Sequence, residues 1–578
     1  MSEQSRYWTR RVMPRRSALR AAAAAGSGGV ALSFLAACGG GNDEQTASTT
    51  SAAATTAPQA ALDPTQGKLG GKIVIQQYGD PGSGLKLITS RNAGVHQFSG
   101  FTHDGLLEMR TGIAGSDGYD IETQPNLAQA MPEQPDPLTF VFKLRPAKFH
   151  NGRTVTAEDV KYSYELYAFD PDSAWKRDLP WIDRVDTPDP QTVIVRSKFA
   201  YADAPQAMSA RDKLEILARE HQESPEAENK LMGSGPFLFV DYQPPVMSRY
   251  RRNPEYHRQP YPYFEEIDFL GTSDTEKKIA DFAARQVHMT YYFPPEGRDR
   301  VKQVRPDAQL WSYLRGSDAL YMRTDKPPFN DKRVRQALSM AIDRTALSKG
   351  VTQGEGEPDQ ALSIAGKYWG FRKPSELGEA AKYFEQNVAE AKKLLNAAGV
   401  SLPIKFEVLH WNATVVGPQF VDTITLVESH WASAGIAEVK DGEQTFGQST
   451  STTAVGNYQD AFWGVDPITY AWEIGLALRN RLYWPPEGIT GPPTLNTGYI
   501  NNPQLSALAE QQLGQFDKQE RIQTFRQIED ILAEEQYWLK GVTTSYNFFG
   551  DPSVKNMLVP TFAANAALTF VKHWWFDK

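Results

Sequence analysis

The chain has 578 residues, of which 40% are hydrophobic and 22% are charged. A single hydrophobic core stops growing near roughly 250–300 residues, so this length predicts about two to four domains. The composition excludes a polytopic membrane protein, a fibrous protein and a mostly disordered chain. The 61 Lys and Arg residues against 69 Asp and Glu residues give a net charge of −8. Since such a chain has no counterion-release drive toward phosphates, we expect no nucleic-acid partner.

Cysteine and histidine are too sparse for a built-in metal centre. One Cys excludes a disulfide framework within the chain and a zinc site made of several cysteines. The nine His residues form no pair at helical three- or four-residue spacing, so we expect neither a resident metal nor a cofactor. In contrast, 13 Trp, 24 Tyr and 28 Phe residues favour a roomy binding cleft, because rings bury large areas and stack on ligands.

The N-terminal segment 1–37 has the pattern of an export signal. Arg10, Arg11 and the RRSALR stretch at 15–20 form a cationic head, and the weakly apolar stretch 21–37 is too short to span a bilayer. The head resembles the twin-arginine signal, with Ala18 in place of its usual Phe. That signal is read by a receptor and implies export of a folded protein. The alternative is a membrane-anchoring helix that stays uncleaved.

The end of this segment, LAACG, resembles a bacterial lipobox, which implies that Cys38 is lipidated and becomes the mature N-terminus. Cleavage there removes six Arg residues and Glu3, and takes the net charge from −8 to −13. Residues 38–69 are rich in Gly, Ser, Thr, Ala, Gln and Pro, with almost no aliphatic side chains. Because such a segment buries too little apolar surface to offset its ordering entropy, we expect a flexible tether.

Strand patterns open the globular part. Residues 71–75 predict a short strand that runs into the glycine-rich stretch 78–84, and period-2 alternation predicts a second strand at 139–144. The stretch FHNGRTVTAEDV at 149–160 predicts a tight Asn-Gly turn and a helix capped by Thr156, with Glu158 and Asp159 placed favourably against the helix dipole. Further strands are expected at 193–195, 237–240 and 267–269.

From residue 327 onward the pattern is repeated βαβ. A Pro-Pro break at 327–328 precedes a helix that carries Val334, Leu338, Ala341 and Ile342 on one side. Two further helices, the first capped by Asn387, end at Gly399 and Gly435 and flank a strand at 404–408. The last helices begin at Asn502 and Asp517. The order is mixed α/β throughout, without a repeat of fixed period.

Three stretches together resemble the family 5 extracellular solute-binding proteins, the receptors of peptide/nickel-type ABC importers. They are the 149–160 stretch, GSGPF at 233–237 followed by RNPEY at 252–256, and PFNDKRVRQAL at 328–338. DKQER at 517–521 also resembles a late helix of that family. In this order, behind a lipobox, the stretches identify the chain as a member over about residues 70 to 575.

The resemblance implies an α/β fold of the periplasmic-binding-protein type (type II, the large cluster C form), with two lobes around a deep cleft and two crossing segments. The implied first lobe joins residues 70–94, 220–323 and 541–578, and an inserted subdomain covers 95–219. The implied second lobe is contiguous at 324–540. Hinge closure then engulfs a ligand and presents a closed surface to a permease. We expect a monomer.

The resemblance also suggests where a ligand sits. Peptide-binding relatives carry a segment of the form D-x-x-x-x-G-W-x-x-D-Y, whose later Asp pairs with the peptide's α-amino group. Here the segment 460–470 reads DAFWGVDPITY. Aligned without gaps from Asp460, it has Thr469 in the place of that Asp, and Thr does not pair with an ammonium as a carboxylate does. Asp466 substitutes for that Asp only if the loop shifts. We expect Trp463, Asp466 and Tyr470 at the ligand. The alternative is a core Trp and a turn Asp.

Further ligand-binding candidates are aromatic residues at strand ends and in loops. Trp411 follows a strand at a place where βα loops face a cleft, and Tyr78 and Phe101 are similar candidates. Each has packing as its alternative. Trp472 and Trp484 are weaker candidates, and the C-terminal aromatic cluster at 573–576 is expected to pack. A nickel chelate brought in as ligand remains open, through a single His such as His96 or His410.

We therefore expect a lipid-anchored receptor that captures an oligopeptide or similar small organic solute and passes it to an ABC permease, without chemistry on the solute. An oligosaccharide, a nickel chelate or another non-peptide solute is the alternative ligand, and a sensor lipoprotein without transport shares this architecture. A secreted serine hydrolase is disfavoured. The chain has no H-E-x-x-H, G-x-S-x-G or phosphate-loop motif, and its S-x-x-K matches at Ser83 and Ser173 lack convincing partner motifs.

Overall fold

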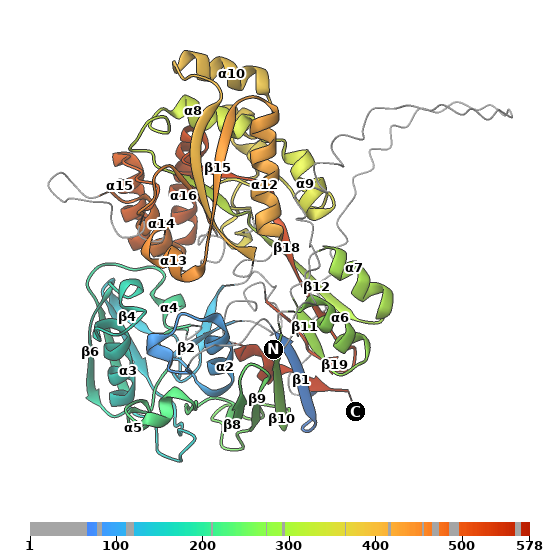
Figure 1. Ribbon diagram of the computed structural model, residues 1–578. Helices are drawn as coiled ribbons and strands as arrows, with labels where there is room; N and C mark the ends of the chain where they lie inside the picture. The colour runs from blue at the N-terminus through green and yellow to red at the C-terminus, as the bar shows by residue number, and fades with distance from the viewer. Residues whose placement is uncertain are drawn as a thin grey trace, which may run out of the picture. The chain divides into compact units, whose positions relative to one another are not determined.

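The computed structural model describes the globular part of the chain with short gaps (Figure 1). The described residues are 66–77, 84–110, 121–209, 212–272, 274–291, 295–364, 366–413, 418–453, 456–464, 473–484, 496–560 and 568–577. Within these ranges the strands form a seven-stranded, a five-stranded and a four-stranded sheet and two small two-stranded sheets. Within the same ranges, no helix combines the length and the apolar character needed to cross a membrane.

The seven-stranded sheet has the strand order β12-β18-β11-β1-β10-β9-β8. Its strands are β1 (Lys72–Gln77), β8 (Phe237–Gln243), β9 (Met247–Arg252), β10 (Glu266–Gly271), β11 (Met289–Tyr291), β12 (Gln309–Arg315) and β18 (Thr544–Gly550). The predicted first strand is confirmed as β1, which runs parallel to β10 with Ile73 opposite Ile267 and Ile75 opposite Phe269. Helices α6 (Thr275–Ala283) and α7 (Pro295–Val304) cover an apolar cluster on this sheet.

The four-stranded sheet has the order β4-β5-β7-β6 and packs under helix α3 (Ala157–Phe169). Its strands are β4 (Glu133–Asp136), β5 (Thr139–Lys143), β6 (Ile182–Asp189) and β7 (Thr192–Ser197). The alternation predicted at 139–144 is confirmed, because Phe140 and Phe142 are buried while Val141 between them is only half-buried. One continuous apolar cluster joins this sheet to the seven-stranded sheet, and we call the two together the first lobe.

The five-stranded sheet, order β15-β14-β16-β13-β17, is the centre of what we call the second lobe. Its strands are β13 (Ala319–Met322), β14 (Ile404–Trp411), β15 (Ala437–Gln444), β16 (Ala461–Gly464) and β17 (Trp538–Lys540). Helices cover both faces (Figure 1): α8 (Lys332–Met340), α9 (Arg344–Thr352), α10 (Val388–Ala397) and α12 (Pro418–Ser433) on one, and α14 (Ile474–Leu482), α15 (Pro503–Gln511) and α16 (Lys518–Glu535) on the other. β13 lies in this sheet although it precedes residue 324.

Helix ends in the second lobe follow the predicted capping residues. Asn387, Asn502 and Asp517 each accept a hydrogen bond from the first turn of α10, α15 and α16, respectively. Gly399 and Gly435 have positive φ values of 70° and 64°, the left-handed conformation expected after a helix. These local signals therefore set the helix boundaries as the sequence predicts.

The remaining elements are short. They include α2 (Ala93–Thr102), β2 (Leu107–Met109), β3 (Thr123–Pro125), α4 (Ala204–Ala207), α5 (Arg219–Gln222), α13 (Phe446–Ser451), β19 (Val554–Lys555) and β20 (Trp575–Phe576). The C-terminal aromatic cluster packs as expected, since His573, Trp574 and Trp575 are all buried.

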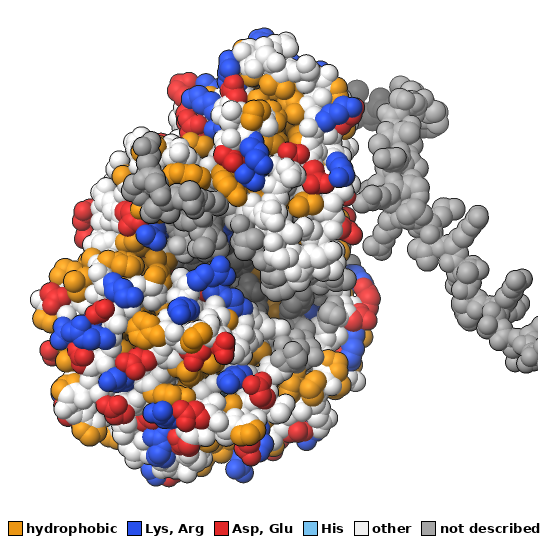
Figure 2. Space-filling model, turned by 60° about the vertical axis from the view of Figure 1, so that its left-hand side comes forward, with side chains coloured by type: hydrophobic (Ala, Val, Ile, Leu, Met, Phe, Trp, Pro, Cys, Tyr) orange, Lys and Arg blue, Asp and Glu red, His pale blue; other side chains and the backbone are white. Residues whose placement is uncertain are grey.

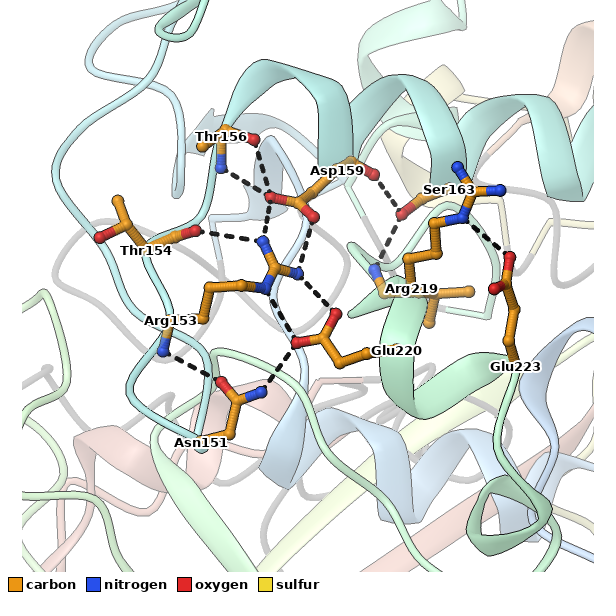
Figure 3. Close-up of polar contacts among 10 residues, drawn as sticks. Asn151, Arg153, Thr154, Thr156, Asp159, Ser163, Arg219, Glu220 and Glu223 are labelled. Atoms are coloured by element: carbon orange, nitrogen blue, oxygen red, sulfur yellow. Dashed lines mark hydrogen bonds and ion pairs between the residues drawn. The ribbon is translucent and has the colours of Figure 1, made fainter.

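The 149–160 motif serves the fold of the first lobe (Figure 3). The guanidinium of Arg153 donates two hydrogen bonds to the Asp159 carboxylate, at 3.0 and 2.8 Å, and two more to Glu220. Asp159 also accepts from the backbone N–H and the hydroxyl of Thr156, both at 2.9 Å, at the start of α3. Glu220 receives a further bond from Asn151 in the turn. The motif thus joins a turn, a helix N-terminus and α5 through one arginine.

We expect Asp159→Asn to lower the free energy of unfolding by about 1–3 kcal/mol, because it weakens charge-assisted hydrogen bonds to a largely buried carboxylate. Glu223→Gln is the matched control. It removes an exposed pair with Arg219 in the same region (Figure 3), of the kind worth about 0.5 kcal/mol or less. Urea unfolding followed by circular dichroism measures both. Equal effects of the two variants would contradict the role given to Asp159.

Candidate functional site

Among the predicted ligand residues Trp411, Trp463 and Phe101, which the structure describes, Trp411 is the most exposed. It ends β14 at the carboxyl edge of the second sheet and is half-buried. Its indole N–H donates to the hydroxyl of Ser449 at 2.5 Å, and its ring meets Phe462 edge-on with the centroids 6.1 Å apart. A ring held in this way at a strand end suits stacking against a solute, and its role there stays a prediction.

Trp463 is 1% exposed and lies within the core of the second lobe. It sits on β16 opposite Leu320 and His410 and faces the side covered by α8, α9 and α12. Its indole N–H has no hydrogen-bond partner among the described residues. Trp463 therefore packs in the core, which is the alternative that the sequence left open. Its ring offers almost no surface to a ligand.

Phe101 is also 1% exposed, which removes the basis for expecting it at a ligand. The centroid of its ring lies 4.8 Å from that of Tyr250, 5.9 Å from that of Phe269 and 6.2 Å from that of Phe237. It occupies the last turn of α2, which packs against the seven-stranded sheet. We correct that expectation, because Phe101 is a core residue of the first lobe.

Several candidates lie outside the described residues, namely Cys38, Tyr78, Asp466, Thr469, Tyr470 and Trp472. The two His candidates are buried and already paired. His410 contacts Asp441 at 2.7 Å and the Trp411 carbonyl, while His96 contacts Glu215 and the Ser90 carbonyl. In the described part of the chain, no group of three or more His, Cys, Asp or Glu residues is arranged to hold a metal ion.

Two crossing segments connect the lobes, from β12 to β13 and from β17 to β18. Beside these segments, the Asp359 carboxylate and the Lys540 ammonium lie 3.7 Å apart and are fully buried in the second lobe. The Asp359 carboxylate accepts from the backbone N–H of Ser317 at 2.8 Å, and Lys540 donates to the Ser317 carbonyl at 3.1 Å. The same buried charges thus hold the chain where it passes between the lobes.

A second contact between the lobes lies outside these segments. Arg521, near the start of α16, donates two parallel hydrogen bonds to the Asp203 carboxylate, at 2.5 and 2.8 Å. The two side chains are 3% and 1% exposed. Asp203 also accepts from the backbone N–H of Gly475 at 2.7 Å, and Arg521 donates to Gln512. The charges are therefore satisfied on both sides of the contact.

A neighbouring buried pair joins Lys213 of the first lobe to Glu473 of the second, at 2.6 Å. The hydroxyl of Tyr201 donates to the same carboxylate at 3.2 Å. Burial raises the pKa of Glu473 to about 7, and Lys213 offsets this only in part because Asp212 and Asp203 repel the carboxylate. Burial works against the charged form of Lys213, but Asp212 and Glu473 outweigh it and raise the pKa of Lys213.

Apolar side chains complete the contact between the lobes. Leu476 and Leu513 of the second lobe belong to the apolar cluster of the first lobe. The backbone N–H of Ala202 donates to the Leu513 carbonyl at 2.7 Å. These apolar contacts therefore add to the ion pairs that join the two lobes. No local sequence pattern marks these residues, apart from Arg521, which is the last position of the DKQER stretch.

The described part of the protein surface drawn in Figure 2 is of mixed charge. Lys and Arg side chains alternate with Asp and Glu over the described part of the face in Figure 2, and the surface is hollowed near the middle of that face. Many charges in the described part of the chain form exposed pairs, such as Lys440–Glu407 and Arg300–Glu276.

We expect Trp463→Ala to lower the free energy of unfolding by about 3–5 kcal/mol, as for other buried Trp truncations. Trp484→Ala is the control, since Trp484 is a half-buried Trp on the same lobe. This substitution should lower the free energy of unfolding by about 1 kcal/mol or less. Thermal or urea unfolding reports both. If Trp463→Ala keeps full stability and loses affinity for solute instead, the core assignment is wrong.

The chain is similar in sequence to several known proteins. Residues 122–472 match the model of the bacterial extracellular solute-binding proteins, family 5 (middle). The chain is 24% identical over 527 residues to heme-binding protein A of Haemophilus influenzae, covering 83% of this chain and 87% of that protein. It is 24% identical over 362 residues to the oligopeptide-binding protein AppA of Bacillus subtilis, covering 59% and 61%.

Solved structures agree in fold. AgaA from A. tumefacien R10, in complex with agropinic acid, superposes with a TM-score of 0.70 at 23% identity, covering 88% of this chain and 99% of that one. AppA from Bacillus subtilis, in complex with a nonapeptide, gives 0.68 at 18% identity, covering 89% and 100%. Because the family model spans more than half of the chain, this protein belongs to family 5 of the bacterial extracellular solute-binding proteins and has their two-lobe α/β fold.

Proposed function

We propose that the protein captures an oligopeptide or similar small organic solute between its two lobes and delivers it to an ABC permease. The solute leaves chemically unaltered, since the family to which the chain belongs binds solutes. A lipid on Cys38 holds the protein at the outer face of the cytoplasmic membrane, in the periplasm or at the cell surface. The protein acts there as a monomer.

The observation that carries this proposal is the pair of contacts between the lobes. A compact hinge around Asp359 and Lys540 connects the lobes, while Asp203 and Arg521 join them outside the crossing segments. Hinged lobes that meet in this way enclose what lies between them, and enclosure favours binding when the closed state makes contacts that the open state lacks. Half-buried Trp411 at the carboxyl edge of β14 is our candidate for stacking on the solute.

A non-peptide solute is the second candidate. The position at which peptide-binding relatives carry an Asp for the α-amino group is Thr469 in this chain. Relatives of similar likeness are named for different solutes, heme in one case and oligopeptides in another, and AgaA was solved with agropinic acid. Thr469 supports a site that does not depend on a free ammonium group.

Native mass spectrometry of the protein from cells that export it tests the function. We expect a co-purified small solute of unchanged mass. A thermal-shift panel of free and N-acetylated peptides, heme, agropinic acid, an oligosaccharide and nickel–histidine then identifies the class of solute. A solute at 100 times its Kd adds about 2.7 kcal/mol to the free energy of unfolding, which raises the melting temperature. Acetylation of a bound peptide should change affinity by less than about threefold. No binder in the panel and no co-purified solute, or a solute returned cleaved, would contradict the proposal.

The lipid anchor has a separate test. We expect Cys38→Ala to release the protein into the periplasm or medium. Alanine has no thiol to carry the lipid, and the polar tether alone does not bind a membrane. Ser48→Ala, within the same tether, is the control and should leave the protein in the membrane fraction. Cell fractionation with immunoblotting measures the distribution. Membrane retention of the Cys38→Ala variant would refute lipid anchoring.

A further inference from the structure

We propose that Asp203 and Arg521 form a latch that holds the two lobes closed in the absence of solute. The latch consists of the bidentate Asp203–Arg521 pair, supported by Gly475 and Gln512. All of these contacts are made between groups of the chain itself. Closure by the latch therefore does not depend on which solute the protein carries.

The latch acts at a distance from the hinge. Helix α16 runs from Lys518 to Glu535 and leads directly into β17, which enters a crossing segment. At about 1.5 Å per residue, Arg521 lies about 20 Å along the helix from its hinge end. A contact at the far end of such a lever resists opening more effectively than the same contact beside the hinge.

Because the pair is buried, the closed state depends on both of its charges. An ion pair that loses one partner leaves the other charge buried and uncompensated, which is strongly unfavourable. Here both charges are nearly fully buried, and the carboxylate and the guanidinium also have neutral hydrogen-bond partners in the closed state. Neutralising Asp203 alone thus penalises the closed state, whereas the open state returns Arg521 to water.

Apolar burial adds to the same contact. Leu476 and Leu513 enter the first-lobe cluster beside the pair, and Ala202 forms its backbone hydrogen bond to Leu513 there. These contacts favour closure without regard to charge, while the bidentate pair fixes the register of the two surfaces. Removing both charges together therefore weakens the latch without leaving an unpaired charge.

A disulfide can report closure directly. A Cβ atom built at Gly514 lies 3.3 Å from the Cβ of Ala200 across the contact, close to the usual range of about 3.5–4.5 Å for disulfides. In solute-free full-length protein, stripped by denaturation and refolding, we expect Ala200→Cys/Gly514→Cys to cross-link under mild oxidation. Mass spectrometry of the linked peptides distinguishes this bond from any that Cys38 forms.

The latch is then removed in the same background. We expect Asp203→Asn/Arg521→Gln to slow cross-linking at least tenfold. Asp186→Asn/Arg196→Gln, which removes a more exposed pair from the four-stranded sheet, should leave the rate unchanged. Circular dichroism verifies folding. If the double variant fails to fold, Arg521→Lys keeps the charge but loses the bidentate geometry and should slow the reaction at least threefold.

Two results would overturn the latch. Cross-linking at an unchanged rate in the folded latch variants would mean that the pair does not hold the lobes together. Failure of the folded parent to cross-link without solute would mean that the lobes are open until a solute arrives. Neither result depends on the identity of the solute, so the proposed transport function can stand or fall separately.

Discussion

The buried Asp203–Arg521 pair is the constraint on which the closed arrangement depends. It joins a short loop of the first lobe to the beginning of α16 in the second, and the neighbouring Lys213–Glu473 pair reinforces it. Buried charges are favourable only when geometry and hydrogen bonding are nearly complete. The contact therefore tolerates one relative placement of the lobes, and small displacements expose or unpair the charges.

The hinge also contains a buried ion pair. Asp359 and Lys540 are fully buried in the second lobe and bind the backbone of the first crossing segment at Ser317. In the proposed closure, this pair sets where the chain bends, and the contact at Asp203 sets how far the lobes close. A solute-binding protein with both features can enclose a guest in a defined volume and still release it by rotation about a short segment.

Local patterns in the sequence predicted much of the fold. The alternation at 139–144 and the caps at Asn387 and Asp517 depend on neighbours a few residues away, and the structure confirms them. Site residues were harder to predict. Trp463 and Phe101 are aromatic residues near loops, yet both are buried, because strand and helix direction rather than residue type decided which way they face. Asp203 and Arg521 are 318 residues apart in sequence, so no local pattern connects them.

The rate at which bound solute leaves tests the account most directly. It is measured by stopped-flow displacement, with the solute recovered from the native protein, in the parent and in the Asp203→Asn/Arg521→Gln variant. If two hinged lobes trap the solute and the buried pair keeps them shut, release of the solute from the variant is at least tenfold faster than from the parent. Equal release rates from two folded proteins would show that lobe closure does not retain the solute.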